Sequence, residues 1–239
     1  MGTTRNSNIE LLRIVCILFV IIHHILTHGC GIYSGNLTPY PWFASYINQL
    51  CYVAVNVFVL ISGYFTIRLS WKKVARIYWL CAIIGCLSYC LHCFEVGNRV
   101  GHSVLWNTIF PFSWSPVWYI PVYICLTLIS PFLNILLENL NKKQYQWLIG
   151  ILIIISCYFG WFWHGRVNTD GYSLFQFVTM YCVGNYIKKY KIECSLKPIT
   201  WFAIWSCFAL ICTMLVYLFQ TKLSNNSFPP TPWIYSYNN

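Results

Sequence analysis

Charge is scarce in this sequence. Only 8% of its 239 residues are charged, whereas 58% are hydrophobic and the mean hydropathy is +0.59. A soluble domain carries about 25% charged residues. This chain therefore has too little polar surface to cover a fold in water. The composition predicts an integral membrane protein, built as an all-α, polytopic bundle of transmembrane helices.

Several chemical signatures are also missing. The sequence contains no glycine-rich phosphate loop and no Gly-x-Ser-x-Gly nucleophile motif, which excludes these two local devices for holding phosphate or activating serine. It shows no internal repeat, no low-complexity tract and no soluble domain. Residues 1–239 are therefore predicted to form a single membrane-embedded domain.

Cysteine is abundant, with 13 residues, but most of the cysteines lie inside apolar runs. There they behave as small hydrophobic residues, so we expect no disulfide framework, and Cys30 is the one candidate on the outer face. His28 lies four residues after His24 and could share a metal with it, but no third ligand is obvious. We therefore predict no metal site.

Seven apolar runs are candidates for crossing a membrane, which takes about 20 residues. They lie near 9–28, 43–66, 75–95, 117–137, 146–163, 172–189 and 199–220. The chain ends in a proline-rich segment without a charged tail. Such an end is possible for a complete protein, but it is also typical of a truncated one.

The net charge of +10 comes from short basic clusters between the apolar runs. This pattern is typical of loops that contact anionic lipid, so membrane lipids rather than nucleic acid are the expected partners. With the N-terminus inside, 12 of the 15 basic residues lie on the inner side and 3 on the outer side. The positive-inside rule therefore predicts a multi-pass protein with a cytoplasmic N-terminus.

The first apolar run carries both Arg13 and His24, and ionisable residues at such depth usually have a function. Eleven residues at about 100° each return a helix to within roughly 20° of the same face. His24 is a candidate general base. The alternative is a histidine that only bonds a neighbouring helix. Arg13 is a candidate phosphate ligand, or it reaches the interface and pairs with Glu10.

Three further groups of residues have open interpretations. His23 points about 100° away from His24, so we expect it to be structural or to support the site. Arg76 and Lys73 belong to a basic cluster between the second and third runs, which contacts lipid or recognises a polyphosphate ligand. In Ser62-Gly63-Tyr64, the glycine permits either tight helix packing or a helix break near a ligand.

Three motifs in order resemble the acyltransferase-3 family of bacterial membrane proteins. They are Asn8-Ile-Glu-Leu-Leu-Arg13 with His24 eleven residues after the arginine, Asn56-Val-Phe58 to Ser62-Gly63-Tyr64, and Trp118-Tyr119-Ile-Pro-Val-Tyr123 running to Ser130-Pro131. The resemblance covers essentially the whole chain and implies about ten spans, of which about seven are present, so we expect the chain to be truncated. Val59 and Trp79 depart from the family pattern, where a second aromatic residue and a proline are common.

The resemblance implies a membrane enzyme that transfers acyl groups other than amino-acyl groups. The donor would be cytoplasmic acyl-CoA, most simply acetyl-CoA, used as a co-substrate with no bound cofactor. The acceptor would be a hydroxyl of a cell-surface polysaccharide or its lipid-linked precursor at the bacterial cell membrane. The alternative is a small-solute transporter or solute-binding module, although the matching broken repeats of such transporters are not evident.

The resemblance also implies roles for individual residues. His24 and Arg13 would be catalytic, and Glu10 and His23 would support them. The expected acyl-CoA-binding residues are Arg13, Arg76, Lys73 and Ser62.

Overall fold

A computed structural model of the chain describes residues 7–32, 41–96, 118–159, 171, 173–193 and 195–225. Throughout this described part the regular elements are helices, and no strand occurs in it. The all-α prediction is confirmed.

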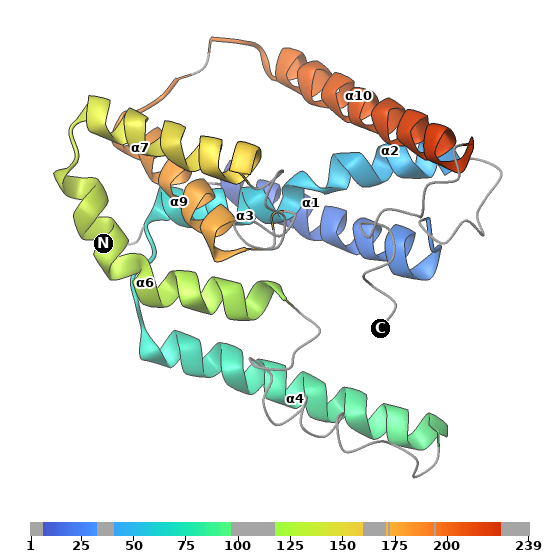
Figure 1. Cartoon of the computed structure of the whole chain (residues 1–239). Helices are drawn as coiled ribbons and strands as arrows, with labels where there is room; N and C mark the ends of the chain where they lie inside the picture. The colour runs from blue at the N-terminus through green and yellow to red at the C-terminus, as the bar shows by residue number, and fades with distance from the viewer. Residues whose placement is uncertain are drawn as a thin grey trace. The chain divides into compact units, whose positions relative to one another are not determined.

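Figure 1 shows the described helices in chain order, coloured from blue near the N-terminus to red near the C-terminus. Two of them, η1 and η2, are π-helical turns that continue α1 and α7. In chain order the elements are α1 (Ser7–His24), η1 (Ile25–Gly29), α2 (Pro41–Cys51), α3 (Val53–Phe65), α4 (Trp71–Val96), α6 (Tyr119–Asn139), α7 (Lys142–Ile154), η2 (Ile155–Phe159), α9 (Leu174–Lys189) and α10 (Pro198–Asn225).

Among the described residues, five helical stretches are long and apolar enough to cross a membrane. They are Ser7–Gly29, Trp42–Phe65, Trp71–Leu91, Tyr119–Asn139 and Pro198–Leu218. Each coincides with one of the predicted spans. No residue in the most apolar window of the third stretch is buried, as expected of a helix whose solvent is lipid.

The two remaining predicted spans, 146–163 and 172–189, also contain helices, but these are shorter. Helix α7 begins at Lys142, where Asn141 and Gln144 form a reciprocal capping box. Residues 160–163 of the predicted span lie outside the described residues. Helix α9 has 16 residues, which is about 24 Å at 1.5 Å per residue, less than the roughly 30 Å hydrocarbon core.

The described helices fall into two compact units. The first takes residues 1–58 and 192–239, and in it α2 packs against both α1 and α10. The second takes residues 59–191, and in it α9 packs against α6 and α7. The fully buried side chains of the second unit include Leu126, Leu137, Tyr145, Phe177 and Tyr181.

Within the second unit, α3 and α9 cross at two glycines. A Cβ atom on Gly63 would collide with the backbone carbonyl of Tyr181, and one on Gly184 would collide with the carbonyl of Leu60. Only residues without a side chain allow two helix backbones this close. The structure therefore selects tight helix packing from the two interpretations of Gly63.

Candidate functional site

The first group of candidate site residues lies on α1. Because Ser7–His24 is one uninterrupted α-helix, Arg13 and His24 share a face, three turns apart. The helix continues as a π-helical turn, Ile25–Gly29, immediately after His24. Such turns are rare and occur frequently at functional sites.

Arg13 is oriented by a carboxylate of its own helix. Its Nη1 donates to Oε1 of Glu10 at 2.7 Å, and both side chains are 38% exposed. A pair at this spacing and exposure contributes little to stability. Its consequence is geometric, because it restricts the direction in which the guanidinium points.

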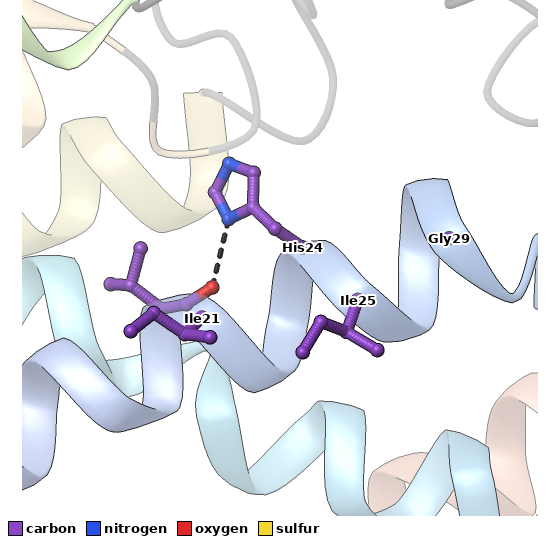
Figure 2. A pocket seen from close by; sticks show the side chains of 5 residues that line it. Ile21, His24, Ile25 and Gly29 are labelled. Atoms are coloured by element: carbon purple, nitrogen blue, oxygen red, sulfur yellow. Dashed lines mark hydrogen bonds between the residues drawn. The ribbon is translucent and has the colours of Figure 1, made fainter.

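The ring of His24 is exposed and anchored to its own backbone. Its Nδ1 lies 2.8 Å from the carbonyl oxygen of Val20 (Figure 2). A carbonyl can only accept, so Nδ1 carries the proton of the neutral ring. The lone pair is therefore on Nε2, the nitrogen at the far side of the ring, and this is the tautomer that a general base needs.

An open, mostly apolar depression of ≈ 490 Å³ lies beside His24. Its lining residues all come from α1 and the π-helical turn (Figure 2). They are Val20, Ile21, His24, Ile25 and Gly29. Gly29 adds no side chain to this surface, and a Cβ there would come no closer than 3.9 Å to Ile25.

His23 has a different environment from His24. Its Nδ1 lies 2.7 Å from Oδ1 of Asn48 on α2, and Asn48 is only 1% exposed. The ring of Tyr52 is 5.0 Å from the His23 ring, and the His24 ring is 5.5 Å away at a right angle. His23 therefore links α1 to α2 and touches the His24 imidazole edge to face.

The other predicted ligands of the donor belong to the second unit. Ser62 lies on α3 with its Oγ 3.5 Å from the hydroxyl of Tyr123 on α6. Two of the three sequence motifs thus meet at this pair. Lys73 and Arg76 lie in the first turns of α4 and are exposed. Arg13 and His24 belong to the first unit.

The basic cluster around Lys73 consists of four cations. Among the described residues, none of the four side chains forms an ion pair. Cations without carboxylate partners suit an anionic ligand or lipid head groups. The cluster comprises Arg68, Lys72, Lys73 and Arg76.

The sequence of residues 6–239 matches the family model described as an acyltransferase domain of the acyltransferase-3 type. The chain belongs to the acyltransferase-3 family. The resemblance inferred from the three motifs is confirmed. No curated protein and no solved structure matches this chain.

The protein is thus a membrane-embedded acyltransferase. Acyl transfer to a hydroxyl needs a base for the acceptor proton and positive groups for the developing oxyanion and the donor. On α1, His24 supplies an imidazole suited to act as the base, and Arg13 supplies a guanidinium suited to act as a positive group. Within the described part of the chain, no three histidine, cysteine or acidic side chains gather around a point.

A polar network in the second unit of the acyltransferase was not predicted from the sequence. The hydroxyl of Tyr181 donates to Oδ1 of Asn134 at 2.6 Å, and both side chains bond the backbone of Ile67. Asn48, in the first unit, was missed as well. The sequence held a signal for both sites: Asn134 and Asn48 are each an asparagine inside an apolar run, and such residues usually bond another helix.

Proposed function

We propose that this acyltransferase moves an acetyl group from acetyl-CoA, supplied from the cytoplasm, to a hydroxyl of a cell-surface polysaccharide or its lipid-linked precursor. The observation that carries the proposal is the hydrogen bonding of the His24 ring. Its protonated Nδ1 faces the Val20 carbonyl, its basic Nε2 is on the exposed side of the ring, and Arg13 lies on the same face of α1.

The reaction follows from these groups. Nε2 of His24 accepts the proton of the acceptor hydroxyl while its oxygen attacks the thioester carbonyl carbon. The C–O bond of the new ester forms and the C–S bond breaks. The departing CoA thiolate then takes the proton from the imidazolium, which returns His24 to its starting state.

The cationic residues have the complementary task. A guanidinium binds phosphate or a developing oxyanion through two parallel hydrogen bonds. Arg13, held by Glu10, is the candidate on α1. Arg76, Lys73 and Ser62 are the candidates in the second unit. The positive-inside count supports a multi-pass topology in the cell membrane with the basic cluster on the cytoplasmic side, where CoA is available.

The test uses cell membranes that contain the full chain, a crude polysaccharide fraction and acetyl-CoA labelled in the acetyl group. We expect label in the polysaccharide, released by mild alkali because an O-acetyl ester is base-labile. Membranes with His24→Ala should not transfer the label. If intact labelled solute instead accumulates in sealed vesicles, with no alkali-labile product, the protein moves a solute and the proposal is wrong.

A further inference from the structure

The short connection between α3 and α4, residues 66–70, is held by side chains from two other helices. Both backbone polar groups of Ile67 are bonded: its N–H donates to the Tyr181 hydroxyl at 3.0 Å, and its carbonyl accepts from Nδ2 of Asn134 at 2.9 Å. The tyrosine hydroxyl in turn donates to Oδ1 of Asn134 at 2.6 Å. The three bonds form a closed ring.

Breaking one bond of this ring would cost free energy. Tyr181 is fully buried, and a buried hydroxyl or amide without a partner is strongly unfavourable. Each member of the ring satisfies the other two, so loss of one leaves two polar groups unpaired. The three groups therefore have one low-energy arrangement, and this arrangement fixes the position of residues 66–70.

The backbone next to the ring confirms that the connection is constrained. Thr66 has φ = 61°, a left-handed conformation that is rare for a β-branched residue. Its N–H donates to the carbonyl of Gly63 at 3.1 Å. Such a conformation persists only where the surroundings over-determine it.

The constrained connection leads directly into the basic cluster. Arg68 follows Ile67 in the chain, and Arg76 lies in the second turn of α4, whose first residue is Trp71. We propose that Asn134 and Tyr181 are positioning residues for the donor: by clamping Ile67 they hold the basic cluster in one orientation, ready for the phosphates of CoA. This inference rests on the proposed function, which assigns the cluster to the donor.

The clamp predicts an effect on donor affinity rather than on the chemical step. Pre-organised cations lose less freedom when the polyphosphate binds. Removing the clamp should therefore raise the dissociation constant of CoA and the KM for acetyl-CoA, and leave kcat at saturating acetyl-CoA unchanged. A residue that only supports packing would lower the amount of active enzyme and therefore kcat.

The experiment compares the full chain in detergent with Tyr181→Phe, Asn134→Leu and the double variant. Tyr145→Phe is the matched control, because this tyrosine is equally buried but its hydroxyl bonds the Cys182 carbonyl and Asn185 rather than Ile67. Asn185 itself reaches the connection only through a 3.5 Å bond to the Thr66 side chain. CoA binding is measured by calorimetry, and amide hydrogen exchange is followed over 66–70. If Asn134→Leu does not fold, Asn134→Asp replaces it, since it keeps the acceptor for Tyr181.

We expect each single variant to weaken CoA binding about tenfold, and the double variant to be no worse, because the network acts as a unit. Exchange at Ile67 should accelerate in both variants and not in Tyr145→Phe. If wild-type protein binds CoA, Arg76→Ala weakens binding and the clamp variants bind like wild type, the clamp inference is wrong and the proposed function stands.

Two further results would also count against the inference. If the clamp variants lower kcat and the thermal midpoint while the CoA dissociation constant is unchanged, or if Tyr145→Phe matches Tyr181→Phe, the network is only structural. If wild-type protein does not bind CoA, or a variant with alanine at Arg68, Lys72, Lys73 and Arg76 binds it as well as wild type, the donor assignment of the cluster fails and the clamp inference fails with it.

Discussion

Oδ1 of the buried Asn48 accepts a 2.7 Å hydrogen bond from Nδ1 of His23, so this ring is tied to helix α2. The neighbouring His24 instead bonds the Val20 carbonyl one turn back on its own helix. Two consecutive histidines thus have separate anchors, one to a neighbouring helix and one local. We therefore expect His24 to act as the base and His23 to hold α1 against α2.

We expect His24→Ala to lower the acyl-transfer rate by about 10²–10⁴-fold, the usual contribution of a general base, with membrane insertion unchanged. His23→Ala should cost less than about tenfold in rate but should lower thermal stability, because Asn48 loses a partner that is worth about 1 kcal/mol. Initial rates and thermal midpoints in detergent measure both effects. A larger rate loss for His23→Ala would show that we assigned the base to the wrong histidine.

Substituting lysine for arginine tests the donor role of Arg13 and Arg76. Lysine keeps the charge and loses the two-pronged guanidinium, so we expect Arg→Lys to weaken CoA binding by about tenfold at each position. A role in topology or lipid contact predicts that lysine serves as well, since the positive-inside effect depends on charge. Calorimetry on wild type, Arg→Lys and Arg→Ala decides between them. Equal affinity in all three forms at both positions would eliminate the donor site.

The effect should be clearer at Arg13 than at Arg76. Lys72 and Lys73 lie four and three residues before Arg76, about one helical turn away, and can supply part of a lost charge. Arg13 has Glu10 beside it, which orients its guanidinium. Glu10→Gln should therefore weaken CoA binding less than Arg13→Ala does.

The glycine crossing of α3 and α9 gives a prediction about stability. Gly63→Ala and Gly184→Ala place a methyl group against rigid backbone, and overpacking of this kind costs about 1–3 kcal/mol. Gly150 on α7 is the matched control, because a Cβ there meets nothing within 4 Å. Gly150→Ala should be neutral or should stabilise the helix by about 0.5–1 kcal/mol. The three variants are compared by their thermal midpoints in one detergent. Equal midpoints for all three would contradict the glycine crossing.

Lys189 should stabilise the end of α6. Its ammonium donates to the carbonyls of Leu137, Glu138 and Leu140 at 2.7, 3.0 and 2.9 Å, and it lies 5.7 Å from the ring centres of Tyr145 and Tyr190. A cation at a helix C-terminus is favourable, so Lys189→Met should cost about 1–3 kcal/mol.

The adjacent Lys188 is exposed and provides the control for Lys189. Lys188→Met removes the same charge from the same last turn of α9 without touching the α6 carbonyls. Thermal midpoints of the two variants should differ by several degrees, with Lys189→Met lower. Equal midpoints would mean that the three hydrogen bonds contribute nothing measurable.

The topology prediction is tested with reporter fusions, because 13 cysteines complicate labelling. A phosphatase fused after Asn36, which lies outside the described residues, should be active on the outer side. The same phosphatase fused after Asn141, the N-cap of α7, should be inactive on the inner side. Activity at both points would refute the span assignment and the depth argument for Arg13 and His24.

The sequence by itself determined the class of protein and the family. With little charge and long apolar runs, the chain is stable as a bundle of helices in lipid. In lipid the backbone polar groups must bond within each span, and a helix meets this requirement. The spacing of Arg13 and His24 is local information as well, since a continuous helix converts eleven residues into one face. The three motifs that indicated the family lie within short segments that can be read directly from the sequence.

Only the tertiary structure decided which spans touch and what the polar residues inside them do. Ile67, Asn134 and Tyr181 are brought together from α6, α9 and the 66–70 connection, and Gly63 meets α9 near Gly184. Hydropathy cannot reveal these partners, since every apolar helix is equally soluble in lipid. Their choice depends on close packing and interhelical hydrogen bonds, which exist only after the helices have assembled.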